Sequence, residues 1–327
     1  MSMRRVNNSV LFFVRMSISV GLLSYLLWII EWDQAIKTLE QANKLLLLTA
    51  PFCLLTGYVI SSSRWLLVLA DSKVNFSFKQ AYKGYLFGAF YSLFLPGVMG
   101  GDAVRIALCS KTTGGDLGTA VTSVMVERTA GVFALLSFLF FVCLLFPESL
   151  ASAVPIKSTS IVIMLVAIMV TAMTVLVLGR RVLVMRHGQK STRGISTFIH
   201  SGIRALVSLR GRTLGLVLLL SALFQATDII ATFLLARAIG LTLSLKVFFA
   251  VLPLVYLATV IPISLGGLGV REGTLVLLLA HFNVRSLDAV TLSFLIYLNR
   301  VVIGGLGGFV QLAETSKVRA IQQSTEE

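Results

Sequence analysis

Long apolar runs separated by short polar segments make up most of the sequence. A transmembrane helix needs about 20 mainly apolar residues. Six runs approach or exceed that length, at residues 11–30, 45–70, 119–146, 160–178, 214–238 and 289–313. Two further apolar segments, at 84–95 and 274–281, are too short to cross, and another piece at 247–261 ends at Pro262. The pattern predicts an all-α polytopic integral membrane protein with about six full transmembrane helices and two re-entrant broken-helix hairpins, or eight spans if the short segments cross fully.

One short pattern occurs in both halves of the chain. Residues 91–105 and 257–271 each contain an apolar run, a proline, three residues, Gly-Gly, three residues and an arginine; the members are Pro96, Gly100, Gly101 and Arg105, then Pro262, Gly266, Gly267 and Arg271. Proline and paired glycines disfavour a continuous helix. Broken backbone survives in lipid only where protein or a wet cavity covers it. The pair of breaks therefore predicts a polar site inside the membrane, whereas ordinary interhelical turns are the alternative.

The placement of the breaks predicts an inverted repeat. A single membrane domain, residues 1–319, would contain repeat halves at about 45–146 and 214–313, a basic cytoplasmic loop at 179–213 between them, and a disordered tail at 320–327. If each broken element returns to the side from which it came, the first hairpin enters from the cytoplasm and the second from outside. Both breaks would then face each other near the bilayer midplane.

Composition supports a membrane location. Apolar residues make up 57% of the chain and charged residues only 13%, about half the charge density of a soluble domain. The net charge of +14 would suggest nucleic acid for a soluble protein, but cytoplasmic loops of membrane proteins collect Lys and Arg, and no nucleic-acid partner is expected. The charge distribution predicts a multi-pass protein of the bacterial inner (cytoplasmic) membrane with cytoplasmic termini. The run 11–30 lacks a cleavage site, which favours a retained first span over a signal peptide.

The loop 179–213 carries eight basic residues and no acidic one. Apolar residues fall at near-helical spacing within it, at Ile195, Phe198, Ile199, Ile203, Leu206 and Val207. This pattern predicts a basic amphipathic helix on the anionic inner leaflet, and a solvated linker is the alternative.

Charged residues inside apolar segments are costly and commonly functional. Candidates are Asp102, Arg105, Glu127, Arg128, Asp228, Arg237, Arg271, Glu272 and Arg300. Each half offers one arginine after its Gly-Gly pair and a second on the next long helix. Four guanidinium groups, from Arg105, Arg128, Arg271 and Arg300, would suit a phosphate because arginine binds phosphate oxygens in a bidentate manner.

The acidic candidates admit two interpretations. Glu127 and Glu272 each adjoin an arginine and could pair with it, gate it or carry a proton; alternatively, they only neutralise it and lock the hairpins to the bundle. Asp102 could join the substrate site or cap the following helix. Arg237 could merely extend its charge to the membrane surface. The cysteines Cys53, Cys109 and Cys143 lack metal-ligand spacing, so neither a metal nor a cofactor is expected.

These motifs resemble those of a known family. The segment from Leu95-Pro96 to Arg105, the triplet Val126-Glu127-Arg128 and the stretch 262–273 are similar to the membrane region of lysylphosphatidylglycerol synthases, a flippase-like family, with likeness over roughly 10–313. The resemblance implies a lipid-translocating membrane domain. In the synthases this domain is fused to a soluble aminoacyl transferase, whereas this sequence resembles a stand-alone member without one.

We therefore predict a lipid flippase or transporter that moves a phosphate-containing lipid, either a phospholipid or a polyprenyl-phosphate-linked lipid, between leaflets. An enzyme is not expected, and no catalytic residue is assigned. The alternatives are a membrane-embedded transferase acting on a lipid phosphate and a non-catalytic membrane partner of a lipid-modifying enzyme. The lipid, the direction of movement and the oligomeric state stay open.

Overall fold

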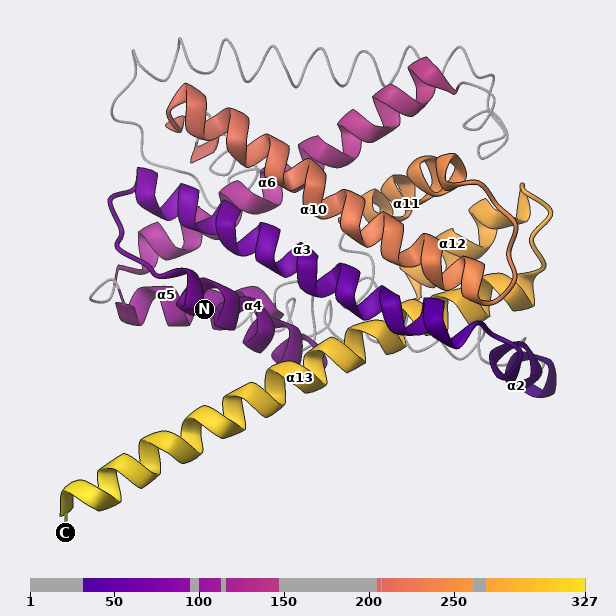
Figure 1. The fold of residues 1–327 in the computed structure, drawn as a ribbon. Coiled ribbons are helices and arrows are strands. Elements are labelled where there is room, and N and C mark those ends of the chain that lie inside the picture. The colour runs from indigo at the N-terminus through magenta and orange to yellow at the C-terminus, as the bar shows by residue number, and fades with distance from the viewer. Residues whose placement is uncertain are drawn as a thin grey trace, which may run out of the picture.

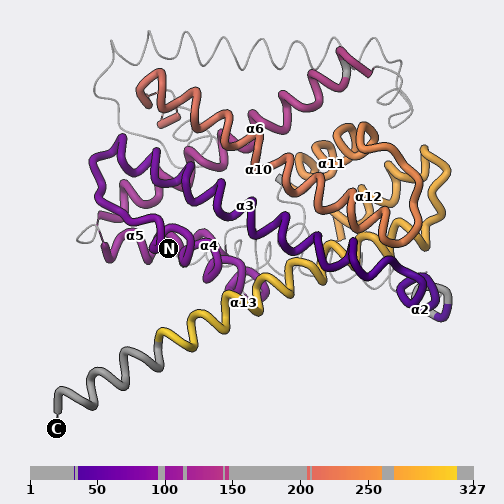
Figure 2. The backbone as a smooth tube through the Cα atoms, in the orientation of Figure 1, coloured from indigo at the N-terminus to yellow at the C-terminus, as the bar shows by residue number. Residues whose placement is uncertain are grey.

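Figure 1 shows the computed structural model of the chain, which describes residues 32–94, 100–112, 116–146, 205–206, 208–260 and 269–326. The regular elements in these ranges are all α-helices, joined by short turns. Figure 2 traces the same backbone in the same orientation.

Four long helices dominate the described part of the chain: α3 (Lys44–Asp71), α6 (Leu117–Leu145), α10 (Gly211–Ala238) and α13 (Ser286–Glu326). Each contains a segment long and apolar enough to cross a membrane. The prediction of an all-α polytopic membrane protein is confirmed. The other two predicted spans, 11–30 and 160–178, and most of the basic loop 179–213 lie outside the described residues.

The remaining helices are short: α2 (Trp32–Glu40), α4 (Phe78–Ser92), α5 (Gly100–Thr112), α11 (Leu245–Val260) and α12 (Val270–Ala280). The longest of them has 16 residues. At about 1.5 Å per residue, none reaches across the roughly 30 Å of hydrocarbon. Helix α4 packs on α5, and α11 packs on α12, so each pair forms a hairpin.

Local sequence determines where several helices begin. The Asn43 side chain accepts hydrogen bonds from the first backbone N–H groups of α3. Ser77 and Gln80 form a reciprocal capping box at the start of α4. The Asp116 carboxylate accepts from the N–H of Thr119 at 3.2 Å at the start of α6. These side chains satisfy N–H groups that have no partner within the helix.

Helices α3 and α10 form an antiparallel pair. The N–H of Asn43, just before α3, donates to the carbonyl oxygen of Ala238, at the end of α10, at 2.8 Å. At the other end, the Thr213 hydroxyl donates to Asp71 at 3.2 Å. Since each of these helices opens a series of long helix, short hairpin and long helix, the first half (α3 to α6) and the second half (α10 to α13) run in opposite directions.

The short hairpin helix α4 or α11 of each half packs against a long helix of the other half. Helix α4 packs along α13, and α11 packs along α6. Gln311 of α13 donates to the Tyr91 hydroxyl of α4 at 2.8 Å, and the rings of Phe138 and Phe249 meet edge to face at 5.2 Å. Figure 1 shows α4 and α5 towards one end of the α3–α10 pair and α11 and α12 towards the other. Each hairpin is thus held by helices of both halves.

Glycines allow two pairs of helices to approach closely, one within the first half and one between the halves. A Cβ atom at Gly101 would lie 2.5 Å from the carbonyl oxygen of Gly88, so the backbones of α4 and α5 touch. A Cβ at Gly307 of α13 would overlap the carbonyl oxygen of Leu86 on α4. Close packing over small residues is a common basis of helix association in membranes, where burial of apolar surface gives little drive.

Large apolar side chains cover the outside of the long helices. Exposed examples include Leu48, Phe52, Leu144, Leu219 and Phe309. In water such a surface would be unusually apolar, whereas in a bilayer it faces lipid. The chain is therefore a multi-pass membrane protein with its polar groups gathered inside.

The last helix is longer than the span predicted at 289–313. It extends from Ser286 to Glu326. Beyond Gly308 the chain has neither glycine nor proline, and Gln, Glu and Ala occur repeatedly there. These residues favour helix, so nothing in the sequence ends α13 earlier.

Candidate functional site

Glu127, in the middle of α6, is the centre of a buried polar cluster. Its side chain is 2% exposed and accepts three hydrogen bonds from three other helices. Arg64 Nε of α3 donates to Oε1 at 3.0 Å, the Tyr85 hydroxyl of α4 donates to Oε1 at 2.6 Å, and Arg105 Nη2 of α5 donates to Oε2. The carboxylate therefore joins the first hairpin to both long helices of its half.

Aromatic rings surround the Arg105 guanidinium. Its central carbon lies 4.3 Å from the ring centroid of Trp65 and 3.9 Å from that of Tyr85. The Trp65 indole donates to the Ser123 hydroxyl at 2.9 Å, which fixes the ring. Cation–π contacts and a charged partner together offset part of the cost of burying a guanidinium.

Asp102 extends the cluster towards the surface. It accepts from Arg105 Nη1 at 3.4 Å and from Arg128 Nε at 2.5 Å. Asp102 thus pairs with two of the predicted arginines, one of which is on the neighbouring helix α6. We call Arg64, Tyr85, Asp102, Arg105, Glu127 and Arg128 the first arginine cluster.

A second arginine cluster lies in the other half. At the start of α12, Arg271 donates to Glu272 Oε1 from Nε at 3.0 Å and from Nη2 at 2.5 Å, and the N–H of Gly269 donates to Glu272 Oε2 at 2.7 Å. Arg300 of α13 forms an ion pair with Asp228 of α10 at 3.8 Å. Tyr256 of α11 interacts electrostatically with Arg271, Arg300 and Asp228. These five charged or titratable residues, Asp228, Tyr256, Arg271, Glu272 and Arg300, make up the second cluster.

Tyr58 of α3 lies between the two clusters. Its ring is 5.7 Å from the ring of Tyr85 in the first cluster. It is close enough to interact electrostatically with Arg105 of the first cluster and with Arg300 and Asp228 of the second. Tyr58 therefore lies within electrostatic reach of charged groups from both halves.

The four predicted arginines fall into two classes by exposure. Arg105 and Arg271 are 6% and 9% exposed, and each is hydrogen-bonded to a glutamate. The side chains of Arg128 and Arg300 are 37% and 40% exposed, and each is paired with an aspartate. Half-exposed guanidinium groups have donors that can reach an incoming phosphate or carboxylate oxygen.

The structure brings the predicted polar residues together in two sets. Asp102, Arg105, Glu127 and Arg128 share the first cluster, and Arg271, Glu272 and Arg300 share the second. Gly100 and Gly101 form the first residues of α5. The remaining predicted helix-break residues, Pro96, Pro262, Gly266 and Gly267, lie outside the described residues, between the helices of each hairpin.

Sequence reasoning missed several members of these clusters. Arg64 is buried and also donates from Nη1 to the Ser221 hydroxyl of α10 at 3.0 Å, so it links the halves. Tyr58, Tyr85 and Tyr256 were not singled out either. Arg64 could have been found in the sequence, because a charge within the apolar run 45–70 is costly in a membrane. The tyrosines could not have been found in this way, since tyrosine is common in apolar helices.

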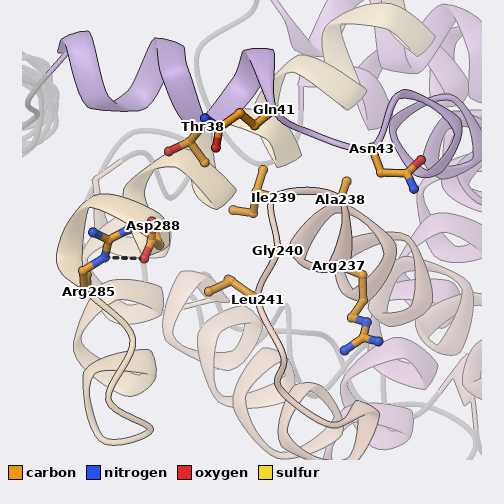
Figure 3. A pocket seen from close by; sticks show the side chains of 10 residues that line it. All are labelled: Thr38, Gln41, Asn43, Arg237, Ala238, Ile239, Gly240, Leu241, Arg285 and Asp288. Carbon is orange, nitrogen blue, oxygen red and sulfur yellow. Dashed lines mark hydrogen bonds and ion pairs between the residues drawn. The ribbon is translucent and has the colours of Figure 1, made fainter.

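A pocket of about 470 Å³ lies apart from both clusters, where the turn after α10 meets α2 and the start of α13. Figure 3 shows its lining, with Arg285 and Asp288 paired on one side and Arg237 on the other side of the turn at Ile239–Leu241. Arg237, a sequence candidate, is exposed there. It belongs to neither cluster, and we do not include it in the candidate site.

Comparison with protein families gives one match, which extends over residues 12–308 and bears the description Lysylphosphatidylglycerol synthase TM region. The match covers both arginine clusters and both hairpins. The chain belongs to this family. A search among individual curated proteins gives no match. Membership of the lysylphosphatidylglycerol synthase TM family supports a membrane role connected with lipid.

Proposed function

We propose that the protein is a lipid transporter that moves a phosphate-containing lipid between the leaflets of the bacterial inner membrane, and that it is not an enzyme. The observation that carries the proposal is the pair of arginine clusters, one in each half, which lie within apolar helices and are both within electrostatic reach of Tyr58. Buried charges in a membrane usually mark a pathway for a polar substrate. We propose cytoplasmic termini for the same protein, following the distribution of basic residues.

A phosphate head group fits the chemistry of these clusters. Arginine offers planar, paired donors that match phosphate oxygens. The described clusters contain five arginines against four carboxylates, namely Arg64, Arg105, Arg128, Arg271 and Arg300 against Asp102, Glu127, Asp228 and Glu272. The family description names a synthase of an aminoacylated phospholipid, which also supports a phospholipid substrate. A polyprenyl-phosphate-linked lipid would present the same group.

The mechanism follows from the arrangement of the halves. A head group would bind the half-exposed Arg128 and Arg300 while its acyl or prenyl chains remain in the surrounding lipid. Rocking of the antiparallel halves against each other would open the arginine clusters to one leaflet and then to the other. Arg105 and Arg271, buried and paired with glutamates, would hold the hairpins in position and supply positive potential.

Transport by the purified protein in liposomes tests the proposal. Fluorescent phosphatidylglycerol in the outer leaflet is bleached by dithionite, so protein-dependent exchange between leaflets becomes visible. Replacing Arg128 and Arg300 together by Gln should slow exchange about tenfold or more, because each charge-assisted hydrogen bond contributes roughly 1.5–3 kcal/mol. Arg237→Gln, which removes an exposed arginine outside both clusters, is the matched control.

Two results would contradict the proposal. Exchange at the wild-type rate in the double variant would show that the clusters do not handle the head group. Absence of exchange in the wild-type protein, together with formation of a modified lipid from a labelled donor, would favour the membrane-embedded transferase instead.

A further inference from the structure

We propose that Asp228 is an internal counter-ion of Arg300, which holds the guanidinium in the absence of substrate and is displaced from it by the phosphate of an entering lipid. The inference rests on the proposed function and identifies the interaction that substrate binding replaces. It assigns to Asp228 a role in controlling access to the site.

The pair between Arg300 and Asp228 is the loosest of those that the four predicted arginines form. The two side chains are 3.8 Å apart, and no hydrogen bond joins them in the described part of the chain. In contrast, Arg128 reaches Asp102 at 2.5 Å, and Arg271 reaches Glu272 at 2.5 Å. Because the Arg300 donors are not fully used by Asp228, they are the most easily transferred to another anion.

A weakly bonded donor lies beside this pair. The Tyr256 hydroxyl is buried and makes no hydrogen bond of ordinary geometry to any described residue, but it is close enough to Asp228 for a weak side-chain hydrogen bond. Buried hydroxyls without a well-formed hydrogen bond are uncommon, because a poorly made bond costs free energy. A phosphate oxygen bound to Arg300 would give this hydroxyl a better acceptor.

Exposure and local charge also favour Arg300 as the position at which an anion binds. The Arg300 side chain is 40% exposed, whereas Asp228 is mostly covered, with 15% of its side chain exposed. Arg271 is close enough to Arg300 to interact with it electrostatically. An anion arriving at Arg300 therefore meets positive potential from two guanidinium groups and competes with one carboxylate.

If Asp228 competes with the lipid phosphate for Arg300, removing the charge of Asp228 should strengthen lipid binding. Asp228→Asn keeps the size of the side chain but removes the charge that competes for Arg300 and repels the phosphate. Binding of a phosphate lipid should therefore become tighter, by about threefold to tenfold, which corresponds to a partly exposed charge pair. Arg300→Gln should weaken binding, and in that background Asp228→Asn should give a smaller gain.

The test is equilibrium binding of short-chain phosphatidylglycerol to the full chain in detergent, with inorganic phosphate as a separate probe that distinguishes a lipid site from a general anion site. Asp288→Asn is the matched control, because Asp288 pairs with Arg285 outside the clusters. Each variant is first checked for its unfolding temperature. Tyr256→Phe provides a second variant that leaves all charges in place and should weaken binding about threefold, the loss of one hydrogen bond.

The outcomes separate the inference from the function on which it rests. Tighter lipid binding by folded Asp228→Asn, with Asp288→Asn unchanged, supports the counter-ion. If the wild-type protein binds the lipid and Arg300→Gln weakens binding, but Asp228→Asn and Tyr256→Phe bind as the wild type does, the counter-ion role is wrong and the proposed function stands. Should Asp228→Asn not fold, the Tyr256→Phe result decides alone. No lipid binding by the wild-type protein would refute the proposed function itself.

Discussion

Arg105 donates from Nη2 to Oε2 of Glu127, and both side chains are buried within the helix bundle. This pair joins the helix that follows the first break to a long helix of the same half. Arg64 and Tyr85 donate to the other carboxylate oxygen, so α3, α4 and α5 all donate to a single acidic side chain of α6. Of the two interpretations of Glu127 in the sequence, the geometry favours a lock that holds the hairpin to the bundle.

Glu127→Gln should therefore destabilise the protein. The change leaves Arg64 and Arg105 buried without their carboxylate, and breaking a buried ion pair costs about 3–5 kcal/mol. We expect a clearly lower unfolding temperature in detergent, measured by tryptophan fluorescence. Glu40→Gln, at an exposed position of α2, is the control. Equal unfolding temperatures for the two variants would show that the buried carboxylate does not hold the bundle together.

The sequence predicts the long helices well because apolar length alone sets them. The run predicted at 45–70 is α3, Lys44–Asp71, and the run at 214–238 is α10, Gly211–Ala238. Helix α4 ends at Ser92, four residues before Pro96, and α11 ends two residues before Pro262. Proline disfavours helix in the adjacent backbone, but it does not always end one, since Pro253 lies inside α11.

The tertiary arrangement could not be predicted in the same way. In a membrane, side chains that face lipid and side chains that pack inside are both apolar, so the pattern does not reveal which helices meet. That α4 contacts α13 and α11 contacts α6 appears only in three dimensions. Arg64 was overlooked because a single charge hardly changes the average hydrophobicity of a long run. Its partner Glu127 is 63 residues away.

The glycines of α13 allow a direct test of the contact between the halves. Gly307 faces the backbone of Leu86 on α4, whereas a Cβ at Gly305 would meet nothing within 4 Å. Gly307→Ala should destabilise the protein by about 1–3 kcal/mol through overpacking. Gly305→Ala should be neutral or slightly stabilising, because alanine favours helix.

Unfolding temperatures of the two glycine variants provide the measurement. They share a helix and a substitution and differ only in what the new methyl group meets. A loss of stability for Gly305→Ala that equals the loss for Gly307→Ala would contradict the packing of α4 on α13.

The two hairpins should open to opposite sides of the membrane. Helix α4 begins and α5 ends near one end of the bundle, whereas α11 begins and α12 ends near the other (Figure 1). Single cysteines at the exposed positions Lys79 and Lys111 should react with a membrane-impermeant maleimide from one side only, and cysteines at Lys246 and His281 from the other. Cells and inverted vesicles give the two sides, and permeabilised membranes give the total.

A label near the tip of the first hairpin separates re-entry from crossing. If α4 and α5 each crossed the membrane, Lys79 and Lys111 would still react from the same side, but a cysteine at the exposed Phe94 would react from the opposite side. Labelling of Lys79 and Lys111 from different sides would contradict the first hairpin.

Linking α4 to α13 should stop transport if the halves rock against each other. Tyr91 and Gln311 are joined by a hydrogen bond of 2.8 Å between their side chains and lie on helices from different halves. In a protein whose native cysteines are replaced by serine, Tyr91→Cys and Gln311→Cys should be bridged efficiently by a short, cleavable bis-maleimide. Lipid exchange in liposomes should then fall to the level without protein and return when the bridge is cleaved.

The single-cysteine variants treated with the same reagent should keep their activity, because a modified side chain alone does not join the halves. Efficient bridging with unchanged exchange would show that α4 and α13 move together, and that transport uses a motion within each half.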